Sequence, residues 1–356
     1  MKKSIRSALI AIALLTGSSA AQADATADLW AALKGSNDAA ALAAIKKGAD
    51  VNKVGTGTLG TPLQLAACFA GPDVVKALID AKSNVNFVEP TTTYTPLLSA
   101  LQWGNLEAAK LLLAAGANLK YSAKTTNALG AALASSRLET IKLVLDAGEN
   151  PSAPMMVAGV QFTPWIMFAE RSLTPKEMVT RLQNVQIPFL KNVLQITPPA
   201  WVASQTEASF APLGEVTALL LSKGAQINEV HPGLGTALFV AAKRGKIDIV
   251  KALIDGKANL EILSFAGGTV GPYMLTPLMY AAALGQNDVV ELLCAAGAQV
   301  NTPSQHRVGS GTATATTTTL ITKITTHTAV SLASEFKHPD TVAILRKHGG
   351  KGPSEP

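Results

Sequence analysis

The chain has 356 residues, of which 48% are hydrophobic, 15% are charged and 5% are aromatic. Its formal net charge is +6 at pH 7, and its lysines are spread along the chain rather than clustered. Nucleic-acid binding therefore lacks the basic patch that it needs, and no nucleic-acid partner is expected.

The first 23 residues have the composition of a secretory signal peptide. Three of the first six residues are basic, an apolar run covers residues 8–15, and the small residues AQA follow at Ala21–Ala23. We expect cleavage after this AQA and export of the mature chain to a bacterial periplasm. The apolar run is far shorter than the roughly 20 residues that span a bilayer, so no membrane insertion is expected after cleavage.

The rest of the chain repeats one pattern. TPLQLAACFAGPDVVKALIDAKSNVN begins at Thr61, and TPLLSALQWGNLEAAKLLLAAGANLK, from Thr95, aligns with it without a gap. TPLMYAAALGQNDVVELLCAAGAQVN repeats the pattern from Thr276, and the unit from Thr197 keeps it with extra residues between its helices. Units are thus predicted near residues 27, 61, 95, 127, 163, 197, 236, 276 and 328, which makes residues 24–349 one repeat domain followed by a disordered tail, 350–356.

These segments resemble ankyrin repeats, whose signature TPLxxA…GxxxVVxLLLxxGAxxN they carry almost letter for letter. The resemblance implies an all-α solenoid of eight or nine helix-turn-helix units with β-hairpin fingers. It also implies a protein partner, bound in a concave groove that the fingers and the first helices form. We expect the chain itself to be a monomer.

The chemistry of one unit agrees with this resemblance. Thr61 can cap the first helix, and Pro62 suits the first helical position because no N–H is needed there. A second helix is predicted from near Asp73, and a glycine follows it at the left-handed C-cap in most units. In two units Lys82 and Lys257 stand at this place, which leaves their caps unexplained. A single pair of helices is too small to bury its own apolar face, so stability must come from stacking.

The glycines of VGTGTLGT, which starts at Val54, have the GxGxxG spacing of a dinucleotide-binding loop. No hydrophobic strand precedes Gly55, and Pro62 removes an N–H that a phosphate site would use. We therefore interpret this stretch as a finger. Other fingers are predicted in EVHPGLGT before Thr236 and in FAGGTVGPYMLT before Thr276.

The sequence contains no HExxH, GxSxG, Walker lysine or CxxC motif, and neither an enzyme, a cofactor nor a metal is expected. An enzyme would need a polar pocket built from an insertion such as residues 189–213, and Glu207 and the nearby Glu215 are the only candidate acids for it. Four of the five histidines fall near the C-terminus, and His306 and His327 flank one long connection. Without a tight ligand spacing they are interpreted as loop histidines.

Two cysteines in an exported chain raise the question of a disulfide. Cys68 ends a first helix near the start of the array, whereas Cys294 lies in a second helix six stacking steps later. At roughly 8–10 Å a step, the separation far exceeds the 7 Å limit for a bridge. We expect two free thiols, with Cys68 the more accessible.

The groove is predicted from first-helix positions that the repeat leaves variable. Most of the residues there are large and apolar: Phe69, Leu98, Trp103, Ile166, Phe239, Met279 and Leu284. They form either a partner-binding stripe, with Trp103 and Phe239 as anchors, or a surface that finger residues or insertions cover. The histidine that the family often has in TPLH is absent, which predicts a weaker polar network between repeats.

The longest connection, residues 302–327, is rich in β-branched Thr and Ile. It is either an enlarged hairpin arm or a Thr-rich loop. The sequence as a whole favours a periplasmic, non-enzymatic protein-binding scaffold that uses the ankyrin groove. An inhibitor, immunity or stress-protection protein for an exported enzyme or toxin is the alternative.

Overall fold

The computed structural model describes residues 21–56, 59–157, 160–192, 194–267, 270–306 and 327–352. The predicted signal peptide lies almost entirely outside these residues, and a helix covers residues 21–34. The chain divides into two compact units. Unit 1 contains the chain up to Glu149 together with Met155–Gln161 and Leu173–Ala211. Unit 2 contains Asn150–Pro154, Phe162–Ser172 and the chain from Pro212 onward.

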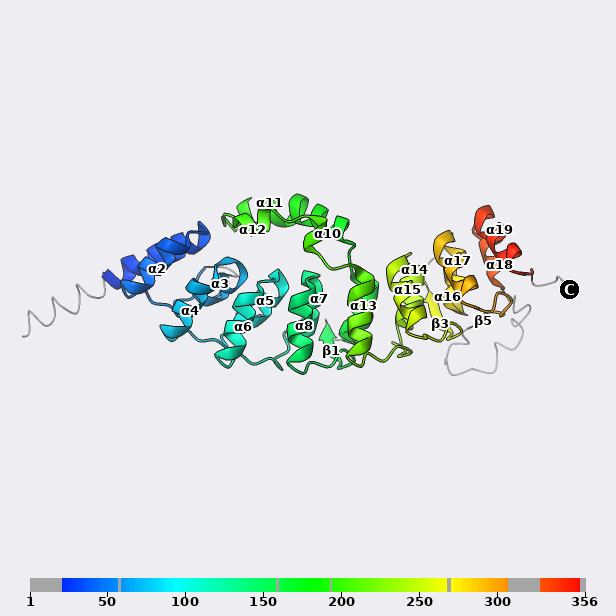
Figure 1. Ribbon diagram of the computed structural model, residues 1–356, viewed down its shortest axis with the longest axis horizontal. Coiled ribbons are helices and arrows are strands. Elements are labelled where there is room, and N and C mark those ends of the chain that lie inside the picture. Colours follow the sequence, from blue (N-terminus) through cyan, green and yellow to red (C-terminus); the bar gives the residue numbers. More distant parts are fainter. Residues whose placement is uncertain are drawn as a thin grey trace, which may run out of the picture. The chain divides into compact units, whose positions relative to one another are not determined.

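Unit 1 consists of helices stacked in two rows (Figure 1). The first helices of the repeats form an inner row in which α3 packs on α5 and α5 on α7, and the second helices form an outer row from α2 to α8. Their bounds are α2 Asp38–Lys46, α3 Pro62–Phe69, α4 Pro72–Asp80, α5 Pro96–Trp103, α6 Leu106–Ala114, α7 Ala128–Ser135 and α8 Leu138–Asp146. These helix pairs are the predicted repeats.

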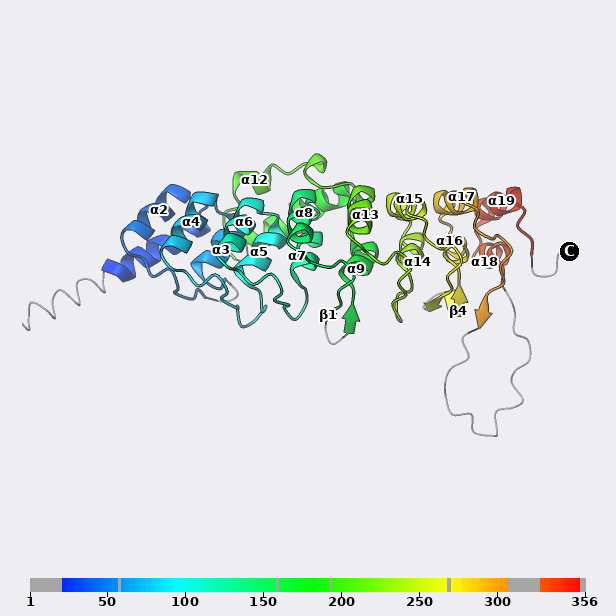
Figure 2. The ribbon, with the colours of Figure 1, turned by 60° about the horizontal axis from the view of Figure 1, so that its bottom comes forward.

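Unit 2 has the same two rows, and Figure 2 separates them. Here α9, α14, α16 and α18 form the inner row, and α13, α15, α17 and α19 form the outer row. The bounds are α9 Pro164–Arg171, α13 Leu213–Ser222, α14 Ala237–Lys243, α15 Ile247–Asp255, α16 Pro277–Ala283, α17 Asn287–Ala295, α18 Ala329–Glu335 and α19 Pro339–Lys347. The all-α ankyrin-type solenoid is thus confirmed within each unit.

The core of every repeat is built from the same positions. Leu63, Leu97 and Leu129 are at most 1% exposed, and small alanines such as Ala66 and Ala100 let neighbouring inner helices approach closely. Most outer helices bury two adjacent small or β-branched residues near their starts and a Leu or Val one turn later. Stacking of these faces buries apolar surface that no single helix pair could bury alone.

The helix ends follow the predicted capping chemistry. The Thr61 hydroxyl accepts a hydrogen bond from the backbone N–H of Gln64 (3.4 Å), and Thr236 does the same for Phe239 (3.1 Å). After the outer helices, the predicted glycines, Gly116, Gly148, Gly224 and Gly297, have φ between 87° and 93°. Lys82 and Lys257 adopt the same left-handed conformation, with φ of 67° and 66°. The chain therefore forms this cap even where a side chain makes it costly.

Asparagine side chains link successive repeats beyond the outer helices. Asn52 Oδ1 accepts a hydrogen bond from the backbone N–H of Asn84 (2.8 Å), and Asn52 Nδ2 donates to the Lys82 carbonyl (3.2 Å). Asn86 makes the equivalent pair in the next repeat. These asparagines belong to the GAxxN end of the signature, so this end of the motif carries polar contacts between repeats.

The fingers before Thr236 and Thr276 are confirmed as tight hairpins. An isolated bridge joins His231 to Gly235, and the antiparallel strands β3 (Ser264–Gly267) and β4 (Gly271–Leu275) precede α16. β5 (Gln305–His306) pairs with β4, and a further hairpin joins β1 (Met155–Val157) to β2 (Val160–Phe162). Most of the predicted long finger, residues 307–326, lies outside the described residues.

Two of the predicted boundaries differ in the structure. Thr197 does not begin a repeat: α9 packs on α14 and α13 packs on α15, so α9 and α13 take the first- and second-helix places of one repeat. The chain between them, Leu173–Ala211, is an insertion that belongs to unit 1. At the other end, the predicted disordered tail is held at its start, because Gly350 and Lys351 donate backbone hydrogen bonds to Leu345 and Asn301.

Candidate functional site

The insertion, residues 173–211, crosses the ends of the inner helices of unit 1 (Figure 1). It contains α10 (Pro175–Arg181), a π-helix (Leu182–Gln186), α11 (Ile187–Asn192), α12 (Ala200–Ala203) and a 3₁₀ turn (Glu207–Ser209). Thr197 donates a backbone hydrogen bond to the Lys34 carbonyl (2.7 Å), and Ala211 donates one to the Ser136 carbonyl (2.8 Å). Trp201 Nε1 donates to the Phe69 carbonyl (3.3 Å). These contacts attach the insertion to the inner–outer helix turns of three repeats.

Arg137 is the main side-chain clamp on the insertion. Its guanidinium carbon lies 6.0 Å from the centre of the Trp201 ring and 5.4 Å from that of Phe210. The guanidinium also donates a hydrogen bond to Gln205 Oε1. Burial lowers the pKa of Arg137 below its usual value, because the charge has lost part of its water. The two rings and the amide oxygen offset part of this loss.

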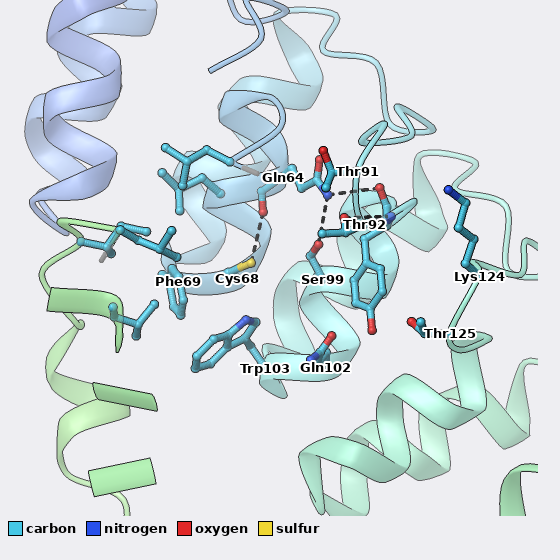
Figure 3. Close-up of a pocket in the computed structure, with 16 residues that line it drawn as sticks. Gln64, Cys68, Phe69, Thr91, Thr92, Ser99, Gln102, Trp103, Lys124 and Thr125 are labelled. Carbon is cyan, nitrogen blue, oxygen red and sulfur yellow. Dashed lines mark hydrogen bonds between the residues drawn. The ribbon is translucent and has the colours of Figure 1, made fainter. Parts of the chain in front are cut away.

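A cavity of about 480 Å³ lies between the insertion and the inner helices α3 and α5 (Figure 3). Its apolar wall consists of Leu59, Leu65, Phe69, Trp103, Leu190, Leu194 and Ile196. Its polar lining consists of Gln64, Cys68, Thr91, Thr92, Tyr94, Ser99, Gln102, Lys124 and Thr125. Figure 3 places the two aromatic rings toward the insertion and Lys124 with Thr125 on the opposite side.

Glu89 shapes the finger at the rim of this cavity. Its side chain is buried and accepts hydrogen bonds from the backbone N–H groups of Thr91 (3.0 Å) and Thr92 (2.5 Å) and from the Thr92 hydroxyl (2.7 Å). Burial opposes ionisation of Glu89, but these hydrogen bonds outweigh it and lower its pKa. The carboxylate thus fixes the turn that presents Thr91 and Thr92.

Gln64 occupies the fourth place of the TPLH motif at the floor of the cavity. Its Nε2 donates to the Tyr94 carbonyl of the next finger (3.1 Å) and to the Ser99 hydroxyl (3.4 Å). The predicted loss of polar contacts between repeats is therefore wrong at this position, because glutamine replaces the histidine as a bridge. In the equivalent places of other repeats stand apolar residues such as Leu98 and Met279, which are buried.

Both cysteines are free thiols. Cys68 is half-buried beside the cavity, and its Sγ donates a hydrogen bond to the Gln64 carbonyl (3.4 Å). Burial raises the pKa of Cys68 to about 12, although a hydrogen bond with Ser99 opposes the rise. Cys294 is buried, and burial together with the charge of Glu291 raises its pKa to about 11.

Of the predicted groove residues of unit 1, Phe69 and Trp103 line the cavity beside the insertion and Leu98 does not. Phe69 and Leu98 are buried, with exposures of 6% and 2%, and Trp103 is half-buried. The rings of Phe69 and Trp103 pack edge to face with centres 4.6 Å apart. Of the two alternatives, unit 1 has the second at two positions, because the insertion covers Phe69 and Trp103. Partner binding by Trp103 stays a prediction, and the site that it lines is a cavity rather than an open groove.

In unit 2 the predicted groove residues are mostly core. Ile166, Phe239 and Met279 are at most 1% exposed, and Leu284 is half-buried. The Phe239 ring packs against Tyr280 with centres 4.9 Å apart. The expectation that the Phe239 ring has no internal packing role is therefore wrong. The reason is that the inner helices stack so closely that the variable position faces the next repeat.

The exposed charged residues at the ends of the inner helices in unit 2 are three basic residues and one acid, Glu335. Arg171 and Arg244, at the ends of α9 and α14, are exposed, and Arg244 forms an ion pair with the largely buried Glu170. Lys243 lies over the Tyr280 ring, with Nζ 5.9 Å from the ring centre. Lys337, just after α18, is also exposed.

The acidic residues and histidines that were considered for a catalytic or metal site do not lie together in one site. Glu207 and Glu215 are both exposed, and neither lines the cavity of unit 1. His327 Nδ1 lies 3.3 Å from Glu335, and His231 stacks on Phe162 with ring centres 4.7 Å apart. In the part of the chain that the structure describes, no three His, Cys, Asp or Glu residues are grouped to hold a metal ion. Within the same residues, no helix has the length and apolar character required to cross a membrane.

Several residues of the site were not predicted from the sequence. Arg137 and Trp201 fix the insertion, while Leu190, Leu194 and Ile196 form the far wall of the cavity. The signal that could have found them is the imperfect repeat around Thr197, where TPPAW replaces the usual TPL and small residues. A tryptophan next to a broken motif is typical of an insertion with its own packing surface.

Comparison with known proteins identifies the family. The family model described as ankyrin repeats (3 copies) matches residues 28–123, 63–155 and 207–304, which is more than half of the chain. The chain belongs to the ankyrin repeat family. The crystal structure of the human ASB11 ankyrin repeat domain superposes with a TM-score of 0.54 and 21% identity, covering 83% of this chain and 100% of that chain. No curated protein matches the sequence.

Ankyrin repeats indicate a scaffold for protein–protein interaction, and the predicted class of protein is confirmed at this level. The family model leaves out residues 156–206, which contain most of the insertion. The model also leaves out residues 1–27 and 305–356, so the insertion is the internal stretch that it does not match.

Proposed function

We propose that the chain is a periplasmic, non-enzymatic scaffold that binds a protein partner through the inner-helix ends of unit 2. The observation that carries the proposal is the contrast between the two units. In unit 1 the insertion covers the inner-helix ends, whereas in unit 2 the corresponding residues Arg171, Arg244 and Lys337 are exposed. Partners of ankyrin repeats bind the inner-helix face. We therefore assign partner binding to unit 2, where the ends of the inner helices are exposed.

The charge of this face favours an acidic partner. Arg171, Arg244 and Lys337 are all exposed, and Arg244 forms an ion pair with Glu170. A basic rim speeds association with an acidic surface and makes binding weaken with salt. The export signal predicted in the first 23 residues is the support for a periplasmic location.

The test is affinity capture of the tagged mature chain from periplasmic extract, followed by mass spectrometry. The same capture is repeated with Arg171→Glu and with Lys251→Glu, a matched reversal of an exposed charge on the outer helix α15. The proposal predicts that an acidic protein is captured by the wild type and by Lys251→Glu, and that Arg171→Glu loses most of it. Equal capture by all three proteins would contradict the proposed face.

The identity of a captured protein separates the two forms of this function. An exported toxin or hydrolase whose activity falls on binding would make the chain an inhibitor or immunity protein. A partner whose activity does not change on binding would indicate that the chain acts as a scaffold and not as an inhibitor.

A further inference from the structure

The cavity of unit 1 is too small to be a protein-binding surface. Its volume is about 480 Å³, within the roughly 300–1,000 Å³ of small-molecule sites. A stable protein interface buries about 800 Å² on each partner, which needs an open face. In unit 1 the insertion lies along that face and supplies Leu190, Leu194 and Ile196 as a wall. The occupant is therefore a small molecule.

One side of the cavity is apolar and is suited to the apolar part of a ligand. The edge-to-face pair of Phe69 and Trp103 lies opposite the aliphatic side chains that the insertion contributes. Phe69 is 6% exposed and Trp103 is half-buried, so both rings are already fixed by packing before a ligand enters. A rigid apolar slot of this kind takes an alkyl chain or an aromatic ring with little ordering cost.

The other side carries a single positive charge. Lys124 is the only charged residue among those that line the cavity, and its ammonium has no ion-pair partner among the described residues. Thr91, Thr92, Thr125 and the amide of Gln102 also line the cavity. The Thr92 hydroxyl donates to Glu89, so it is not free to donate to a ligand. Glu89 lies beneath the rim, but its carboxylate accepts bonds from Thr91 and Thr92. One cation without an ion-pair partner, beside the Gln102 amide, is complementary to one anionic group.

The donor set matches a carboxylate better than a phosphate. Phosphate groups are generally held by several charges, by an arginine fork or by a row of backbone N–H groups. The cavity has one lysine and no arginine in its lining. A single carboxylate, bound by the Lys124 ammonium with the Gln102 amide as an additional donor, satisfies this side.

We infer that the cavity between Phe69, Trp103 and the insertion binds a small amphipathic carboxylic acid. The alkyl or aromatic body lies in the apolar slot, and the carboxylate binds the Lys124 ammonium. This site is separate from the protein-binding face proposed for unit 2, so either assignment can fail without the other.

The test is titration calorimetry of the mature chain with decanoate below its micelle concentration. Decanamide is the uncharged analogue, Lys124→Gln removes the cation, and Lys53→Gln is the control at an exposed lysine of unit 1 outside the cavity lining. We expect 1:1 binding of decanoate, a loss of roughly 5- to 30-fold in affinity in Lys124→Gln, and no change in Lys53→Gln. Decanamide is expected to bind about as weakly to the wild type as decanoate binds to Lys124→Gln.

Alkylation of the native cysteines gives a second readout that needs no variant. Cys68 lines the cavity and Cys294 does not, so decanoate is expected to slow the modification of Cys68 alone. Absence of binding at millimolar decanoate would overturn the inference, as would equal binding of decanamide or protection of both thiols. A peptide with a C-terminal phenylalanine carboxylate that binds where decanoate does not would assign the site to a peptide end instead.

Discussion

Replacing Arg137 by alanine is expected to release the insertion while the repeats stay folded. The guanidinium contacts the Trp201 and Phe210 rings and donates to Gln205. A cation–π contact at a partly exposed site contributes about 0.5–1 kcal/mol. A hydrogen bond from a charged donor contributes about 1.5–3 kcal/mol. Because contacts of one side chain are not additive, we expect a combined loss of about 2–4 kcal/mol in the free energy of opening.

A loss of this size raises the population of the open insertion by roughly 30- to 700-fold. Limited proteolysis reports that population when closing is faster than cleavage, so cuts within residues 173–211 should accelerate by a similar factor. Arg137→Lys, which keeps the charge but not the planar group, is expected to lie in between. Lys142→Ala removes an exposed pair with Glu139 on the same helix and serves as the control.

Two results would refute this reasoning. Unchanged cleavage in Arg137→Ala would mean that the clamp does not hold the insertion. Cleavage that accelerates equally throughout the repeats would mean that Arg137 stabilises unit 1 as a whole, and that the insertion is not a separately opening segment.

Three further predictions concern the repeats themselves. Lys82→Gly is expected to raise the free energy of unfolding in urea by about 0.5–1 kcal/mol, because glycine adopts the left-handed cap conformation without strain, whereas Lys82→Ala should give no gain. Phe239→Ala is expected to cost about 3–5 kcal/mol, measured by the same unfolding, because its ring is buried; a loss below 0.5 kcal/mol would contradict the core assignment. Burial raises the pKa of Cys68 to about 12 and that of Cys294 to about 11, from an ordinary value of 9.0. Burial of the two neutral thiols therefore contributes fully to the free energy of unfolding when the pH is below 9.0. That contribution is lost as the pH rises through these values, and a Cys68→Ala, Cys294→Ala variant should show a flatter decline of melting temperature above pH 9, while an identical decline would contradict it.

Much of the fold follows from local chemistry that one repeat already contains. Thr61 caps, Pro62 starts the helix and glycine ends it, and these effects act within a few residues of sequence. The family resemblance then supplies the stacking. Lys82 shows the limit of the local argument, because the left-handed cap forms there without the residue that favours it. Asn52 of the preceding repeat donates to the Lys82 carbonyl, a contact that the sequence of one repeat does not contain.

The site depends on contacts that the repeat period cannot predict. Thr197 has the Thr-Pro start of a unit, yet it lies in the insertion, where its backbone bonds to Lys34 far away in the sequence. The burial of Phe239 likewise depends on how closely α14 approaches α16, which the pattern of one helix does not report. Position in the repeat indicates the face on which a side chain lies, but only packing decides whether that face is open.

The most direct test of the account is hydrogen–deuterium exchange of the mature chain, read at the amides of Thr197 and Ala211. Both N–H groups donate to carbonyls of the repeats, at Lys34 and Ser136 respectively. Slow exchange at both amides in the wild type, and exchange that accelerates by at least tenfold in Arg137→Ala, is the predicted result. Exchange of both amides at the rate of an unstructured chain in the wild type would show that the insertion does not cover unit 1, and would contradict the cavity that rests on it.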